Sequence, residues 1–184
     1  MKNHLRVIMN VMLALVLTFA CTSVVYADDF TTVNHTVTID VPEVLSLSAD
    51  AGNFTLTFPD FVTTGSETDT KTVVYTVKSN NMGQADDSAA MNANLDFLYD
   101  RVDLKAQVGS YTKVSGNTEL AAASAGFVTI DADVPGVALA NKANSTDDGR
   151  VLNGSIPVTY KGVATADVPS GPQTHILYVT LTTI

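Results

Sequence analysis

A period-two alternation of apolar and polar residues recurs along the chain, and it constrains the fold more than any other feature. Successive side chains of a strand point to opposite faces, so every second residue can be buried. The alternation covers residues 36–41, 45–48, 54–58, 71–78, 102–108, 128–131, 156–161 and 177–182. Half-buried antiparallel sheets produce this alternation, whereas parallel sheets covered on both faces produce solid apolar runs.

Turn-forming residues separate these segments. Clusters of Gly, Asn, Asp, Ser and Pro stand at residues 51–53, 64–66, 115–117, 147–149, 153–154 and 169–172. Gly and Asn tolerate the backbone conformations of tight turns, and Pro fixes its own φ. About eight short strands with such turns predict an all-β fold, an immunoglobulin-like antiparallel β-sandwich of about 7–9 strands.

Three segments lack a clean alternation. We expect residues 88–99 to form one short helix or a packed loop. Residues 121–125 and 137–143 are rich in small side chains, and we expect loops or edge strands there. Pro42 and Pro157 have no backbone N–H, so we expect them at edges or bends rather than in a central strand.

The first 27 residues predict an export signal that is cleaved. Lys2 and Arg6 precede a nearly unbroken apolar run, and Ala27 stands where signal peptidase cuts before Asp28. The run is short for a bilayer crossing, and no second run of spanning length follows. We therefore expect residues 28–184 to form a single β-sandwich domain without a transmembrane segment. We expect that domain to be secreted or held at the cell surface, after periplasmic transit in a Gram-negative host.

Cleavage would change the charge and the cysteine content. The whole chain has a net charge of −9, and loss of Lys2 and Arg6 takes it to −11. Such an acid excess disfavours nucleic acids and anionic membrane surfaces as partners. The one cysteine, Cys21, would leave with the signal, so the mature domain would have neither disulfide nor thiol nucleophile. A lipid-bearing Cys21 is the alternative, but Leu17 stands one residue too far from it.

The sequence contains none of the common catalytic motifs. Gly-x-Ser-x-Gly, His-Glu-x-x-His, a phosphate loop and Gly-x-Gly-x-x-Gly are all missing. The predicted mature domain has two histidines, His35 and His175, and the sequence identifies no group that would orient either one. We therefore predict a protein that is not an enzyme. A hydrolase built on these histidines and dispersed acids is the remaining enzymatic alternative.

Aspartates in turns suggest one kind of site. Asp131 and Asp133 would share a face of a predicted strand, and Asp147 and Asp148 precede Gly149 in a turn. Carboxylate and carbonyl oxygens suit calcium, which is plentiful outside cells. We expect no required cofactor, and calcium on these four aspartates is the candidate. A soluble extracellular module that binds calcium or a glycan is thus the alternative function, although the lack of Trp weakens the glycan version.

Both ends of the predicted domain carry a suggestive pattern. Residues 168–171 form a Pro-containing turn before the closing strand at 174–184, and residues 32–41 precede Pro42 and a hairpin at 45–58. Together with residues 74–80, this arrangement resembles exported bacterial surface subunits such as spore coat protein U-like and fimbrial β-sandwich proteins.

The resemblance implies a structural or adhesive subunit that associates with itself or with other surface proteins. In fimbriae, an N-terminal segment of one subunit fills the open edge of the next. The corresponding donor here is the segment 28–41. The alternative, which we favour from the sequence, is that this segment forms the first strand of its own sandwich.

Overall fold

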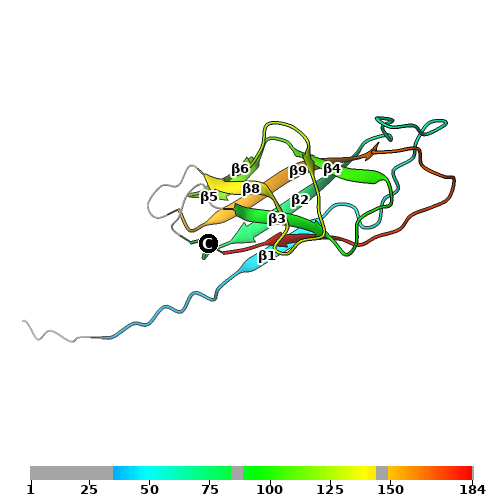
Figure 1. The fold of residues 1–184 in the computed structure, drawn as a ribbon. Helices are drawn as coiled ribbons and strands as arrows, with labels where there is room; N and C mark the ends of the chain where they lie inside the picture. Colours follow the sequence, from blue (N-terminus) through cyan, green and yellow to red (C-terminus); the bar gives the residue numbers. More distant parts are fainter. Residues whose placement is uncertain (1–34, 84–88, 144–148, 184) are drawn as a thin grey trace, which may run out of the picture. The chain divides into compact units, whose positions relative to one another are not determined.

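The computed structural model describes residues 35–83, 89–143 and 149–183. Residues 41–184 form one compact unit, and residues 35–40 belong to a separate unit. The described residues contain ten strands and no helix, and the strands pair antiparallel in two sheets (Figure 1). The predicted all-β antiparallel sandwich is therefore confirmed.

The first sheet contains six strands and the second contains four. The order in the first is β1 (Leu45–Ala49), β2 (Lys71–Ser79), β9 (Leu152–Ala164), β4 (Val102–Val108) and β7 (Val128–Thr129), and β5 (Thr112–Gly116) also pairs with β9. The order in the second is β10 (Leu177–Leu181), β3 (Ala89–Leu95), β8 (Val137–Ala143) and β6 (Glu119–Ala122). The chain passes between the sheets seven times: from β2 to β3, from β3 to β4, and at each of the five connections from β5 to β10. Greek-key sandwiches have such connections.

Strand β9 lies inside the first sheet and alternates strictly between buried and half-buried residues. Ile156, Val158 and Tyr160 point into the core, where they join residues of β2, β3 and β8. One side of β9 pairs with β2 over residues 152–160. The other side pairs with β5 over residues 152–155 and with β4 over residues 158–164.

Pro157 stands at the point where the neighbour of β9 changes from β5 to β4. Its carbonyl accepts a hydrogen bond from Gly109 N at 2.8 Å. A residue of an antiparallel ladder turns its N–H and its C=O to the same neighbour, so the missing N–H of Pro157 lies on this side. The prediction of an edge or bend is therefore wrong: Pro157 lies in a central strand, but where the ladder is interrupted.

Two predicted strands are wrong at the start of the domain. Residues 35–44 have no regular secondary structure, so the first strand is β1 rather than residues 36–41. Residues 54–58 form no strand either, although Phe54 and Leu56 pack against the core. The Phe54 ring stacks on Tyr160 with centroids 5.3 Å apart. The alternating pattern of residues 54–58 thus indicates which side chains are buried, although the segment forms no strand ladder.

The predicted helix or loop at residues 88–99 is also wrong, because β3 occupies Ala89–Leu95. Its pairing with β8 shifts register twice between Ala89 and Asn92. Such a bulge disrupts the period-two pattern, and residues 90–93 are all buried. Residues 137–143 form β8, which lies between β3 and β6 and not in a loop or at an edge. The edge strand expected near residues 121–125 is present as β6.

Candidate functional site

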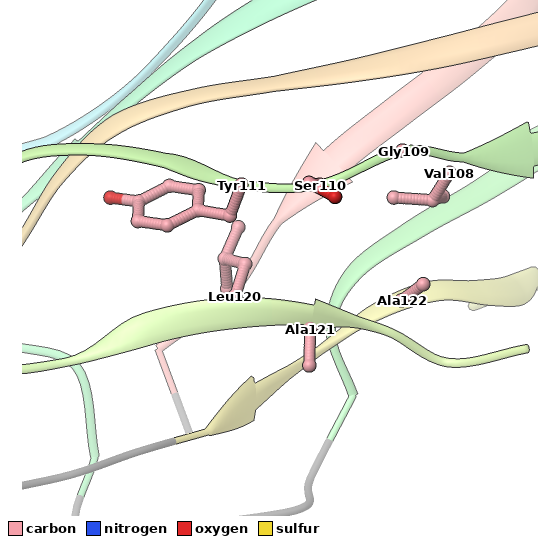
Figure 2. A pocket seen from close by; sticks show the side chains of 7 residues that line it. All are labelled: Val108, Gly109, Ser110, Tyr111, Leu120, Ala121 and Ala122. Carbon is pink, nitrogen blue, oxygen red and sulfur yellow. The ribbon is translucent and has the colours of Figure 1, made fainter.

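A cavity of about 320 Å³, largely open to solvent, lies where residues 108–111 face β6. Figure 2 shows Val108, Gly109, Ser110 and Tyr111 on one side, with Leu120 pointing toward them from β6. Ala121 and Ala122 complete the lining. Residues 109–111 connect β4 to β5 beside Pro157, where the β9 ladder is interrupted. The cavity thus lies at the margin of both sheets.

The lining of the cavity mixes apolar side chains with the polar groups of Ser110, Tyr111 and the backbone, and it carries no charged side chain. Leu120 belongs to the core at 3% exposure, and Val108 packs against that core. Lys113 and Glu119 lie just beyond the lining and form an ion pair at 3.4 Å that joins β5 to β6. The lining therefore offers both polar and apolar contacts to a neighbouring group.

Tyr111 lines the cavity, and its hydroxyl lies against Gly154 of β9. Its hydroxyl is buried and has no hydrogen-bond partner among the residues that the structure describes. Burial raises the pKa of Tyr111 to about 12, and the negative charge of Glu119 contributes to the rise. The Asn153 backbone opposes that rise but does not form a hydrogen bond of acceptable geometry with the hydroxyl. A buried neutral phenol without a partner is uncommon in folded proteins.

Strand β6 forms the exposed margin of the second sheet. It pairs with β8 on one side, and the described part of the chain supplies no strand for its other side. Edge strands present free N–H and C=O groups that another chain can pair with, and charged residues or Pro usually protect them. Ala121 and Ala122 are the exposed residues of β6, and Glu119, paired with Lys113, puts a charge at its start.

The segment 36–41 presents an apolar stripe. Val37, Ile39 and Val41 are 78%, 83% and 71% exposed. They alternate with Thr36, Thr38 and Asp40, so an extended backbone places all three on one face. The prediction that this segment is the first strand of its own sandwich is not met, because it forms no strand.

The chain is held firmly where this segment ends. Val44 N donates to Asn80 Oδ1 at 2.7 Å, and Asn80 Nδ2 donates to the Pro42 carbonyl at 2.7 Å. Asn81 Nδ2 donates to Glu43 Oε1 at 3.1 Å. Asn80 and Asn81 directly follow β2, so they fix residues 42–44 beside the end of that strand.

His175 has an orienting partner that the sequence did not reveal. Its Nδ1 lies 3.4 Å from Asp96 Oδ1. The Tyr99 ring meets the imidazole edge-on at 4.5 Å between centroids. The same carboxylate oxygen accepts the amides of Phe97 and Ile176, both at 2.8 Å. The Asp96 carboxylate thereby joins the loop after β3 to the start of β10.

The environment of Asp96 stabilises its charged form. Burial acts against that charge, but the amides of Ile176 and Phe97 and the nearby His175 together hold the pKa of Asp96 below its usual value. His35, the other histidine of the predicted domain, is exposed and lies outside any strand.

The aspartates predicted for calcium are not arranged as expected. Asp131 and Asp133 share no strand face, because β7 ends at Thr129. The Asp131 carboxylate accepts the Asp133 amide at 3.3 Å, which is the contact of an Asx turn. Asp147 and Asp148 lie outside the described residues. Within the described ranges, no three His, Cys, Asp or Glu side chains are grouped to hold a metal ion.

The sequence offered two weak signals for the cavity: Pro157 within an alternating strand, and Tyr111 outside every alternating segment. Within the part of the chain that the structure describes, no helix has the length and apolar character needed to cross a membrane. Comparison with protein-family models, with curated proteins and with solved structures found no match.

Proposed function

We propose that this chain is an exported, non-enzymatic structural subunit of the cell surface that assembles with further copies by strand addition. The observation that carries the proposal is the exposed stripe of Val37, Ile39 and Val41. Three β-branched residues at period two form an apolar strand face that is suited to burial. Pairing with a sheet edge of another molecule would supply both the burial and the backbone hydrogen bonds.

The spacing of the stripe favours a strand over a helix as the associating element. Helical docking needs apolar residues three and four positions apart, whereas residues 36–41 alternate strictly. Val, Ile and Thr also prefer extended backbone. The segment is therefore suited to join a sheet.

The predicted signal cleavage before Asp28 supports the same role. It would leave the segment 28–41 as the N-terminal arm of the exported protein. The hydrogen bonds of Asn80 and Asn81 to residues 42–44 fix the place where this arm begins. Because residues 42–44 are already fixed, the arm loses less conformational entropy when it docks.

The test compares chain 28–184 with a donor variant, V37S/I39S/V41S. Light scattering coupled to size-exclusion chromatography should show oligomers of the parent chain that grow with concentration. The donor variant should remain monomeric with an unchanged melting temperature, because it changes exposed side chains only. The matched control, T36S/T38S, alters the opposite face of the same segment and should assemble like the parent.

Two results would count against the proposal. One is a parent chain that stays monomeric up to millimolar concentration. The other is a donor variant that assembles as well as the parent, since assembly would then proceed without the stripe.

A further inference from the structure

We infer that Asn53 is the attachment site of an N-linked glycan on the exported protein. Asn53, Phe54 and Thr55 form an Asn-x-Thr triplet, the acceptor sequence for such glycans. The inference rests on the export that the proposed function includes, because this modification occurs on surface segments of secreted proteins. It adds a covalent modification to the assembly role.

The packing of Phe54 turns the two reactive side chains of the triplet outward. The Phe54 ring stacks on Tyr160 in the core, with centroids 5.3 Å apart. Burial alternates along residues 53–58, and Asn53 and Thr55 are both exposed. Residues on either side of an inward-facing one share the opposite face of an extended segment. The Asn53 amide and the Thr55 hydroxyl are therefore presented to solvent together.

The backbone around the triplet is also accessible. Asn53 lies in a bend, and residues 54–58 form no strand. A Cβ added at the neighbouring Gly52 would meet nothing within 4 Å, so the space beside Asn53 is open. An enzyme that modifies Asn53 has to surround the triplet, and an exposed segment outside the sheet ladders permits that approach.

A second triplet of the same kind, Asn153-Gly154-Ser155, shows what distinguishes Asn53. It lies within β9, where β2 pairs with one side and β5 with the other. Asn153 Nδ2 donates to Ser115 Oγ at 2.8 Å, so the amide that would react is already engaged. An enzyme could surround this triplet only after β9 had separated from a neighbouring strand. The triplets that begin at Asn34 and Asn144 start outside the described residues.

The donor for this reaction is an oligosaccharide linked to a polyprenyl pyrophosphate. Asn53 Nδ2 forms a bond to the anomeric carbon of the first sugar, and the bond from that carbon to the pyrophosphate oxygen breaks. The lipid pyrophosphate leaves with the electron pair of the broken bond, and Nδ2 loses one proton. Nothing is oxidised or reduced, so the reaction needs no further reactant.

Peptide mass mapping tests the site on the protein taken from the surface of the cells that produce it. Cleavage before aspartate gives the peptide 50–59, in which Asn53 is the only asparagine. We expect this peptide to carry the added mass of a glycan. The peptide 148–166 contains Asn153 and should have its unmodified mass.

Three variants made in the same cells identify the chemistry. T55A keeps Asn53 but removes the hydroxyl of the triplet, and it should lose the glycan. T55S restores a hydroxyl and should regain it. The matched control, T57A, alters the next exposed threonine of the same segment and should keep the glycan. Melting curves verify that all three variants are folded.

The outcomes separate this inference from the proposed function. An unmodified peptide 50–59 overturns the inference, and so does a glycan that persists in T55A or lies on Asn153 instead. If peptide 50–59 is unmodified but chain 28–184 assembles, the proposed function stands without the glycan. If Asn53 carries a glycan but the chain stays monomeric, the assembly role fails and the modification site stands.

Discussion

Strand β9 and the segment 36–41 share one sequence pattern and differ completely in burial. Every second residue of β9 is buried, and Ile156 is 0% exposed. Ile39 holds the equivalent place in its own alternation and is 83% exposed. The difference lies in the partners, since β9 is paired on both sides. An alternating pattern thus gives an extended chain one apolar face and one polar face. Whether the apolar face is buried depends on the strands that pair with the segment.

Residues 54–58 stand between these two extremes. Phe54 and Leu56 pack against the core, yet their segment joins no sheet. Two hydrogen bonds with Asp69 hold Thr57 in place instead of a ladder. Alternation, ladder pairing and burial are therefore three separable properties.

The largest expected effect compares two isoleucines. Ile156→Ala should lower the free energy of unfolding by about 2–5 kcal/mol, because it leaves a cavity in the core. Ile39→Ala should change it by less than about 0.5 kcal/mol in the monomer, as is usual for exposed positions. Urea denaturation of dilute protein, with light scattering to verify the monomer, measures both.

The same experiment can contradict the difference in burial between β9 and residues 36–41. Equal losses for the two substitutions would mean that Ile39 is buried within its own subunit. The two alternating segments would then differ in position but not in role. If Ile39→Ala leaves the free energy of unfolding of the monomer unchanged but weakens assembly, Ile39 acts between subunits whereas Ile156 acts within one.

The sandwich was predictable because its main signals are local. Alternation and turn residues each operate within a few positions, and they located β2, β4 and β10. Strand β3 was missed because its bulge breaks the period-two pattern. Strand β8 was mistaken for a loop or edge because its small residues carry little strand preference, and its neighbours β3 and β6 supply the stability.

The candidate site was less predictable, since it depends on contacts between distant segments. Tyr111 and Leu120 line one cavity only because β5 and β6 belong to different sheets at the same margin. His175 and Asp96 meet because the start of β10 lies beside the end of β3. No local pattern encodes either contact. The apolar stripe at 36–41 was visible in the sequence, but its exposure was not.

The second largest expected effect concerns steric fit on the buried face of β9. A Cβ added at Gly154 would overlap the Thr112 carbonyl and the Tyr111 ring. Gly154→Ala should therefore cost about 1–3 kcal/mol, the range found for overpacked sites. Gly52→Ala is the matched control, because its Cβ would meet nothing within 4 Å, and it should leave stability unchanged or slightly improved.

Thermal or urea melts of the two glycine variants give the comparison. Equal stability would show that Tyr111 and β5 move aside freely, and the face of β9 would then be defined by its partners alone. A loss confined to Gly154→Ala would show that the shape of the β9 face matters in addition to its apolar character. The segment 36–41 has no such constraint among the described residues.

The smallest effect is a pH dependence located in β9. Tyr160 Oη and Tyr75 Oη share a buried hydrogen bond of 2.9 Å. Burial, together with the neighbouring Tyr75, raises the pKa of Tyr160 far above its ordinary value near 10. A raised folded-state pKa gives stability that is complete below pH 10 and falls as the pH rises further. Each pH unit above 10 should remove about 1.4 kcal/mol through Tyr160.

Urea denaturation at pH 8, 10 and 11 measures this dependence against two controls. In Tyr160→Phe the phenol is gone, so the stability gap between parent and variant should narrow above pH 10. A chain beginning at residue 42 keeps Tyr160 but lacks the apolar stripe, so its stability should fall in parallel with that of the parent. If removal of the arm changed the alkaline profile, the segment 36–41 would be coupled to the core, and its contrast with β9 would not hold.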